Sequence, residues 1–168
     1  VPGCRNISIS VNLSGKQLMH PFLNSQVRNV LTKTKLNPKN LRLEVTESTV
    51  MENSDLAANV LNELNSLGIS FSTDDFGTGY SSLSYLHQFP FKRIKIDRSF
   101  IGKMDTDRKS EAIVKTILML GNNLGIEVVA EGIENEIQLE KLKMLGCQSA
   151  QGFLFSKPVN ELFAQRLL

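Results

Sequence analysis

Side chains that end in a carboxylate or an amide recur in this sequence where short apolar runs finish. The six are Asn12, Glu44, Asp74, Asp75, Asp97 and Glu131. Carboxylates gathered in one place repel one another unless a cation neutralises them. Oxygen ligands with no Cys or His among them suit Mg²⁺ or Mn²⁺ better than zinc or copper. Adjacent aspartates could hold two ions side by side, as in two-metal phosphoester hydrolysis.

The pair Asp74-Asp75 also has a simpler explanation, in which a strand turns into a loop and one aspartate caps the next helix. The equivalent strand-end positions of Asn12, Glu44 and Glu131 favour metal binding over that explanation. Gly77 and Gly79 follow and could suggest a phosphate-binding loop, but the dinucleotide-binding fingerprint needs a third glycine where this chain has Ser82. We therefore expect these glycines to give the loop mobility and a tight turn.

Short runs rich in β-branched residues alternate with longer segments of helical period, the pattern of repeated βα units and a parallel sheet. The expected strands are Ile7–Asn12, Leu41–Thr46, Ile69–Asp75, Arg93–Asp97, Ile126–Glu131 and Ser149–Phe155. The expected helices are Phe22–Lys35, Ser54–Leu67, Arg108–Leu124, Glu134–Leu145 and Val159–Leu167, with a short one after Tyr80. Expected helix ends are Gly68, Gly125 and Gly146, and expected N-caps are Ser54 and Asn135.

Alternate positions along four of these strands are polar, so each polar set points to one face. The sets are Ser8, Ser10 and Asn12; Arg42, Glu44 and Thr46; Ser70, Ser72 and Asp74; and Arg93, Lys95 and Asp97. An open sheet covered by helices would bury these groups, whereas a barrel can collect them in its lumen. We therefore predict an α/β fold of the TIM-type (β/α) barrel, with the site at the carboxyl ends of the strands. Lys95 is expected to point inward, because Ile94 and Ile96 flank it.

Composition and charge indicate one globular domain, since 41% of the 168 residues are apolar and 21% are charged. The net charge of +2 is spread along the chain, so it does not indicate a nucleic-acid polymer as a partner. Cys4 and Cys147 form no CxxC pair, and no apolar run reaches the roughly 20 residues of a membrane span. Because the chain starts at Val1 just before a strand, we expect an excerpt of a longer polypeptide. That polypeptide would be cytoplasmic, or this part would be the cytoplasmic domain of a larger, membrane-bound protein.

Six separated motifs carry a resemblance to a known family. They are SVNLS at Ser10–Ser14, LEVTES at Leu43–Ser48, DDFGTGYSSLSYL at Asp74–Leu86, KIDRSFI at Lys95–Ile101, VVAEGIEN at Val128–Asn135 and QGFLFSKP at Gln151–Pro158. Together and in this order they resemble the EAL domain family, the cyclic di-GMP phosphodiesterases of bacterial second-messenger signalling. The resemblance covers essentially the whole chain.

The resemblance implies a site with two metal ions. Asn12, Glu44 and Asp74 would bind the first ion, and Asp75 and Glu131 the second, with Asp74 between the two. Glu131 is also the family's candidate general base. A carboxylate cannot fully act as metal ligand and base at once, so the two roles are alternatives. Mg²⁺ or Mn²⁺ would be the cofactor.

The resemblance also implies roles in substrate binding and in holding the loop after Asp75. Lys95 resembles the lysine that touches the attacking water or a phosphoryl oxygen, and Gln151 resembles the glutamine that contacts substrate or water. Phe155 and Pro158 could border the guanine pocket. The expected loop-anchoring set is Glu47, Glu134, Gly77, Thr78 and Gly79.

The family's Glu-Ala-Leu motif and its substrate-binding arginine cannot be located in this chain. We therefore expect residues 1–168 to be an EAL domain that lacks its N-terminal part, with six of the eight barrel strands and exposed sheet edges. The function implied is metal-dependent hydrolysis of cyclic di-GMP to linear pGpG. The alternative is a catalytically inactive cyclic di-GMP receptor or interaction scaffold.

Partners are also implied by the resemblance. The family often forms homodimers through helices near the DDFGTG loop, and the candidates here are the short helix after Tyr80 and the helix that starts near Arg108. Sensory domains upstream would fit a signalling protein.

Overall fold

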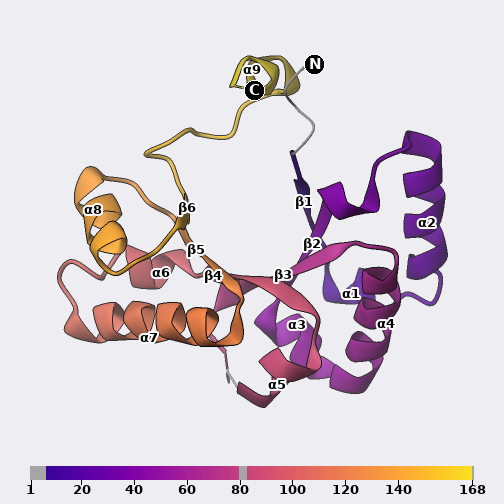
Figure 1. Ribbon diagram of the computed structural model, residues 1–168, viewed down its shortest axis with the longest axis horizontal. Coiled ribbons are helices and arrows are strands. Elements are labelled where there is room, and N and C mark those ends of the chain that lie inside the picture. The colour runs from indigo at the N-terminus through magenta and orange to yellow at the C-terminus, as the bar shows by residue number, and fades with distance from the viewer. Residues whose placement is uncertain (1–6, 80–82, 168) are drawn as a thin grey trace. The chain divides into compact units, whose positions relative to one another are not determined.

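The computed structural model describes residues 7–79 and 83–167, which form two compact units (Figure 1). The first unit, Ser8–Lys95, is called the N-terminal unit below. The second holds the described residues from 96 to 167, together with Ile7, and is called the C-terminal unit. No helix in the described part of the chain has both the length and the apolar character needed to cross a membrane.

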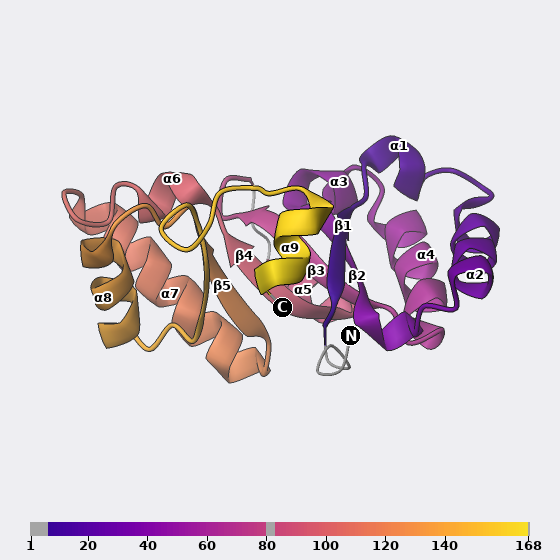
Figure 2. The ribbon, with the colours of Figure 1, turned by 90° about the horizontal axis from the view of Figure 1, so that it is seen from above.

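The N-terminal unit is built from βα repeats. Its elements are β1 (Ile9–Asn12), α1 (Gly15–Leu18), α2 (Leu23–Thr34), the 3₁₀ turn η2 (Pro38–Asn40), β2 (Leu41–Thr46), α3 (Glu47–Glu52), α4 (Ser54–Ser66), β3 (Ser70–Phe76), α5 (Leu83–Gln88) and β4 (Phe91–Ile96). The strands β1, β2 and β3 pair in parallel. Helices α2 and α4 lie side by side (Figure 2), and Leu61, Leu64 and Phe71 are fully buried in the core.

The C-terminal unit continues the same alternation. Its elements are α6 (Arg98–Ile101), α7 (Arg108–Leu124), β5 (Glu127–Glu131), α8 (Glu136–Met144), β6 (Ser149–Gln151) and α9 (Glu161–Leu167). Helix α7 packs on β5, where a Cβ added to Gly121 would lie 2.2 Å from Cγ2 of Val128. Glycine is therefore required at position 121 for the helix to approach the strand so closely.

The strand order is β1-β2-β3-β4-β5-β6, the consecutive order expected of successive βα units. At one end of this order, all four residues of β1 are exposed, and Ile9 and Val11 retain 52% and 46% of their accessible surface. Exposed apolar side chains on this edge strand agree with the expectation that a barrel lacking two of its eight strands leaves its sheet edges uncovered.

Several expected boundaries were wrong. Strand β4 ends at Ile96 rather than Asp97, and β6 ends at Gln151 rather than Phe155. The N-cap position of α4 is Asn53 rather than Ser54, and its side chain makes no capping hydrogen bond. Asn135 caps α8 as predicted, because its side chain accepts a hydrogen bond from the N–H of Gln138 at 2.9 Å.

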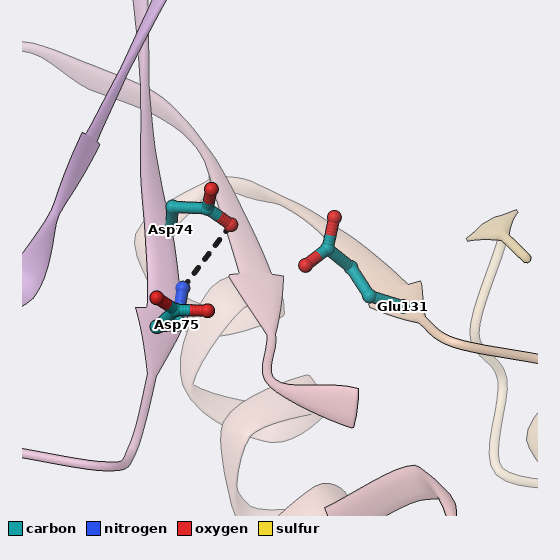
Figure 3. Close-up of side chains that lie close together, drawn as sticks. All are labelled: Asp74, Asp75 and Glu131. Carbon is teal, nitrogen blue, oxygen red and sulfur yellow. Dashed lines mark hydrogen bonds between the residues drawn. The ribbon is translucent and has the colours of Figure 1, made fainter. Parts of the chain in front are cut away.

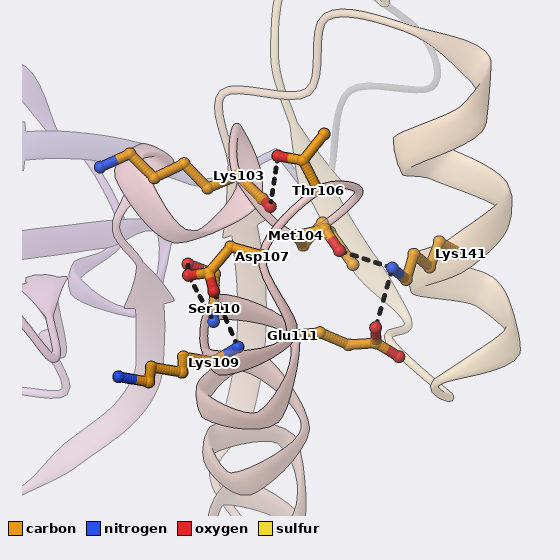
Figure 4. A network of polar contacts seen from close by, with 8 residues as sticks. All are labelled: Lys103, Met104, Thr106, Asp107, Lys109, Ser110, Glu111 and Lys141. Atoms are coloured by element: carbon orange, nitrogen blue, oxygen red, sulfur yellow. Dashed lines mark hydrogen bonds and ion pairs between the residues drawn. The ribbon is translucent and has the colours of Figure 1, made fainter.

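A polar network fixes the start of α7 (Figure 4). The carboxylate of Asp107 accepts hydrogen bonds from the Ser110 hydroxyl at 2.6 Å and from the N–H groups of Lys109 and Ser110 at 3.0 and 3.1 Å. These hydrogen bonds lower the pKa of Asp107, and the one from the Ser110 hydroxyl has the largest effect. From α8, the ammonium of Lys141 donates to the Met104 carbonyl at 2.5 Å and pairs with Glu111 at 2.9 Å. The network thus joins α8 to the α6–α7 connection and to α7.

Candidate functional site

Three of the predicted metal ligands lie at the carboxyl ends of adjacent strands in the N-terminal unit. Asn12 of β1 is the register partner of Glu44 of β2, and Asp74 of β3 is the register partner of Thr46. Glu44 and Thr46 are two residues apart, so their side chains share one face of the sheet. The polar alternation of the sequence therefore corresponds to one polar face across β1, β2 and β3.

The buried ammonium of Lys95 joins two of these groups. Its Nζ lies 2.7 Å from Oε2 of Glu44 and 3.0 Å from Oδ1 of Asp74. The side chains of Lys95, Glu44 and Asp74 are only 7%, 10% and 18% exposed. The prediction that Lys95 points inward is confirmed, and the two carboxylates converge on one positive charge.

The adjacent aspartates are separated by an unusual backbone conformation. Asp75 has φ of 53°, the left-handed region that few residues other than glycine adopt, and its N–H donates to Oδ1 of Asp74 at 3.2 Å (Figure 3). In a regular strand, neighbouring side chains point to opposite faces. The left-handed residue interrupts that alternation one residue before β3 ends, so regular β geometry does not fix the direction of the Asp75 side chain.

Glu47 lies beside the loop that follows Asp75 and makes a hydrogen bond to it. The carboxylate of Glu47 accepts a hydrogen bond from the N–H of Gly77 at 3.2 Å. Glu47 is buried, with only 7% of its surface exposed. A Cβ added to Gly79 would lie 3.3 Å from the same carboxyl group. Thr78 closes the turn, because its hydroxyl donates to the Asp75 carbonyl at 2.8 Å.

Asp97 has a structural partner that the sequence analysis did not foresee. Its Oδ1 accepts the N–H of Ser99 at 2.9 Å and so caps α6. Strand β4 ends one residue earlier, at Ile96, so Asp97 is the first residue after the strand rather than its last.

Two more predicted site residues are neighbours within the C-terminal unit. Glu131, the last residue of β5 and half-buried, is the register partner of Gln151, the last residue of β6. Glu131 is drawn in Figure 3 with the two aspartates. Gln151 is exposed, and its carbonyl accepts a hydrogen bond from the N–H of Ile133 at 3.1 Å. The strand pairing thus places a carboxylate and an amide side by side at one end of the sheet.

The remaining predicted residues, Phe155, Pro158 and Glu134, are exposed and lie in the C-terminal unit. Phe155 retains 55% of its accessible surface and belongs to the turn after β6 rather than to the strand. Glu134 precedes α8, where its N–H donates to the side chain of Gln138 at 2.9 Å.

Two glycines that the sequence analysis missed support the strand ends. Gly132, directly after Glu131, has φ of 71°, and a Cβ there would lie 2.5 Å from Cβ of Arg98. A Cβ on Gly152, directly after Gln151, would lie 2.1 Å from the carbonyl oxygen of Ile133. Their position immediately after the two site residues was the signal that could have revealed them.

The donor set suits a hard divalent cation. Asn12, Glu44 and Asp74 supply only oxygen atoms as ligands, the kind that Mg²⁺ and Mn²⁺ prefer. The contact of Glu44 and Asp74 with one ammonium shows that their carboxylates are close enough to share a single cation. The residues of the N-terminal unit therefore fit a metal of this class.

The chain matches one protein family over most of its length. The EAL domain family model matches residues 4–158. The bifunctional diguanylate cyclase/cyclic di-GMP phosphodiesterase MucR of Pseudomonas aeruginosa is 48% identical over 152 residues, which are 90% of this chain and 22% of that protein. The chain spans about a fifth of the length of the curated relatives that it matches first.

Solved structures share the same fold. PaMucR phosphodiesterase in complex with c-di-GMP is 47% identical, with a TM-score of 0.90 over 96% of this chain and 64% of that one. BlrP1 of Klebsiella pneumoniae in complex with manganese and cyclic di-GMP is 34% identical, with a TM-score of 0.83 over 90% of this chain and 39% of that one. The predicted fold class is confirmed: the chain is an incomplete (β/α) barrel of the TIM type, with six strands among the residues that the structure describes.

Proposed function

The chain belongs to the EAL domain family, and we propose that the protein containing it hydrolyses cyclic di-GMP to linear pGpG with the help of divalent cations. The observation that carries the proposal is the convergence of Glu44 and Asp74 on one buried positive charge at the strand ends. The names of relatives such as MucR, which include cyclic di-GMP phosphodiesterase, support the substrate.

We propose two ions of Mg²⁺ or Mn²⁺ in this site. Asn12, Glu44 and Asp74 would hold the first, and Asp75 and Glu131 the second, with Asp74 between them. Asp74 and Asp75 lie next to each other in β3 and Glu131 ends β5, and all three offer carboxylate oxygen ligands of the kind that these ions prefer, which supports this assignment. Asp97 stays a predicted ligand, although its Oδ1 caps α6.

When bound, such ions polarise a phosphodiester and lower the pKa of a water molecule. Glu131 acts either as a ligand or as the general base that accepts the proton of the attacking water. Lys95 donates hydrogen bonds to the attacking water or to a phosphoryl oxygen and so stabilises the charge that develops there. Its placement beside Glu44 and Asp74 puts a cation close to the proposed ligands.

Substrate contacts are proposed for the end of β6 and the turn that follows. Gln151 would contact substrate or water, and Phe155 and Pro158 would border the guanine base. Their exposure leaves these side chains accessible to a ligand. Glu47, Glu134, Gly77, Thr78 and Gly79 are proposed to hold the loop after Asp75, and the hydrogen bond from Gly77 to Glu47 supports this role.

We further propose a cytoplasmic homodimer, with sensory domains elsewhere in the protein. The candidate contact elements are α5, which follows the DDFGTG loop, and the first turn of α7; the loop's Tyr80 lies outside the described residues. Size-exclusion chromatography with light scattering tests this proposal, and a monomer at high concentration would contradict it.

The hydrolase proposal is tested with three variants of the full-length protein. Asp74→Asn and Glu131→Gln keep the side-chain shape but remove the charge, so we expect turnover of cyclic di-GMP to fall by about a hundredfold or more. Asp105→Asn, an equivalent change at an exposed loop position, serves as the control and should retain full turnover. Near-normal ion-dependent turnover in both site variants would contradict the assignment. Binding of cyclic di-GMP by the unaltered protein without hydrolysis would support the receptor instead.

A further inference from the structure

Lys95 contacts one carboxylate oxygen of each of two proposed metal ligands. Its ammonium contacts Oε2 of Glu44 at 2.7 Å and Oδ1 of Asp74 at 3.0 Å. Those carboxylates belong to adjacent strands and are two of the proposed ligands of the first ion. Oδ1 of Asp74 also accepts the N–H of Asp75, so this one atom links the strand end to the ammonium.

Burial makes the ammonium necessary to the two carboxylates. With Glu44 and Asp74 only 10% and 18% exposed, bulk water screens their charges poorly. Removal of one partner from a buried ion pair leaves an uncompensated charge, which is strongly destabilising. Lys95 therefore neutralises part of the acidic face by itself.

A divalent cation would perform the same task more strongly. Mg²⁺ binds carboxylate oxygens at about 2.0–2.1 Å, closer than the ammonium does here, and carries twice its charge. The ammonium and the ion would repel each other if both lay between the same two carboxylates. An ion that bound these same two oxygen atoms would therefore displace the ammonium.

We propose that Lys95 is an internal counter-ion of the first metal site, which an entering divalent cation displaces from Glu44 and Asp74. The proposal rests on the proposed function, because it takes Glu44 and Asp74 as metal ligands. The lysine has a flexible four-carbon stem and three donors, so the displaced ammonium can turn to phosphoryl oxygens. Metal binding would thereby release the lysine for its role toward the substrate.

Lys95→Met tests the proposal in the full-length protein, with Mn²⁺ alone as the probe. Methionine has a similar shape without charge, so no ammonium has to be displaced. Titration calorimetry should then show Mn²⁺ binding tighter by about tenfold or more. In chelator the variant should melt below the wild type, and Mn²⁺ should raise its melting temperature by about 5 °C more than it raises that of the wild type.

Two further variants make the result specific. Lys92→Met removes an exposed lysine from the same strand, and it should bind Mn²⁺ as the wild type does. Lys95→Arg retains the positive charge, so its Mn²⁺ affinity should not exceed that of the wild type. The arginine variant also covers the case in which Lys95→Met fails to fold, because tighter Mn²⁺ binding by Lys95→Arg would overturn the proposal.

The outcomes separate the two proposals. Equal or weaker Mn²⁺ binding by Lys95→Met, with an unchanged melting response, would overturn the counter-ion role while leaving the metal site intact. Mn²⁺ binding that is detectable only in Lys95→Met would support displacement. If neither protein binds Mn²⁺, the proposed function and this inference both fail.

Discussion

Gly152 is the position at which a single methyl group should disturb both the fold and the proposed site. A Cβ there would lie 2.1 Å from the carbonyl oxygen and 2.3 Å from the nitrogen of Ile133. Ile133 forms two backbone hydrogen bonds in this region, from its N–H to the Gln151 carbonyl at 3.1 Å and from the Leu154 N–H to its own carbonyl at 3.0 Å. Gly152→Ala would push against that backbone, which cannot rotate away as a side chain can.

The expected cost follows from these contacts. Inserting a methyl group into a tightly packed place costs about 1–3 kcal/mol, and each weakened hydrogen bond adds about 1 kcal/mol. A destabilisation of about 3 kcal/mol lowers the melting temperature by about 6–12 °C in a chain of this size. Because Glu131 and Gln151 directly precede the affected residues, turnover of cyclic di-GMP should also fall at temperatures where the variant remains folded.

Two glycine controls separate the steric effect from other effects of alanine. Gly15→Ala adds a Cβ with only ordinary contacts, 3.6 Å from the nearest atom, in the first turn of α1. It should be neutral or slightly stabilising, since alanine favours helices. Gly146→Ala meets no atom within 4 Å but has φ of 81°, so it reports the cost of a left-handed backbone alone, about 1–2 kcal/mol.

Melting curves by circular dichroism and turnover assays on the full-length proteins provide the measurement. If Gly152→Ala melted within about 2 °C of the wild type and kept its turnover, the packing of Gly152 on Ile133 would not support the strand ends as described.

Three further predictions concern stability and reactivity. Asp107→Asn should lower the melting temperature at neutral pH. Folding lowers the pKa of Asp107, so its carboxylate stabilises the folded state fully above the ordinary aspartate pKa, and this stabilisation is lost as the pH falls through the pKa of the folded state. Melting curves of the two proteins should therefore converge in acid. Lys141→Met should lower the free energy of unfolding in urea by about 1 kcal/mol, because the side chain loses its ion pair with Glu111 and its hydrogen bond to the Met104 carbonyl. Lys143→Met, on the more exposed side of α8, should leave the midpoint of the urea unfolding curve unchanged. Burial raises the pKa of the Cys147 thiol, so iodoacetamide should alkylate it more slowly in the folded protein than in urea, as peptide mass spectrometry would show; equal rates would contradict this.

The strands could be predicted because the polar residues repeat with a period of 2. That alternation correctly indicated that Glu44 and Asp74 share a face and that Lys95 points inward. The parallel order of the sheet followed from the alternation of strands with helices. Local pattern was sufficient here, since burial on one face and polarity on the other fix the register of each strand.

The strand ends were harder to predict, because tertiary contacts decide them. Ser149–Phe155 was expected as one strand, but the close approach of Gly152 to Ile133 turns the chain after Gln151. Asp97 was expected to extend β4, and it caps α6 instead. In both cases the apolar pattern continued past the point where the backbone changes direction.

Short helices were missed although one carries a recognisable signal. Ser14 and Gln17 form a capping box at α1, in which the Gln17 side chain accepts the N–H of Ser14 at 3.0 Å. The left-handed backbone of Asp75 had no comparable signal, because only a small fraction of aspartates adopt that conformation and nothing in the local sequence marks this one. The direction of the second aspartate is therefore a property of the folded loop rather than of the local sequence.

Chromatographic analysis of cyclic di-GMP after incubation with the full-length protein is the most direct test of metal-dependent hydrolysis. Linear pGpG should accumulate in Mg²⁺ or Mn²⁺, a chelator should stop the reaction, and added Mn²⁺ should restore it. Recovery of intact cyclic di-GMP under all three conditions, or hydrolysis that the chelator leaves unchanged, would contradict it.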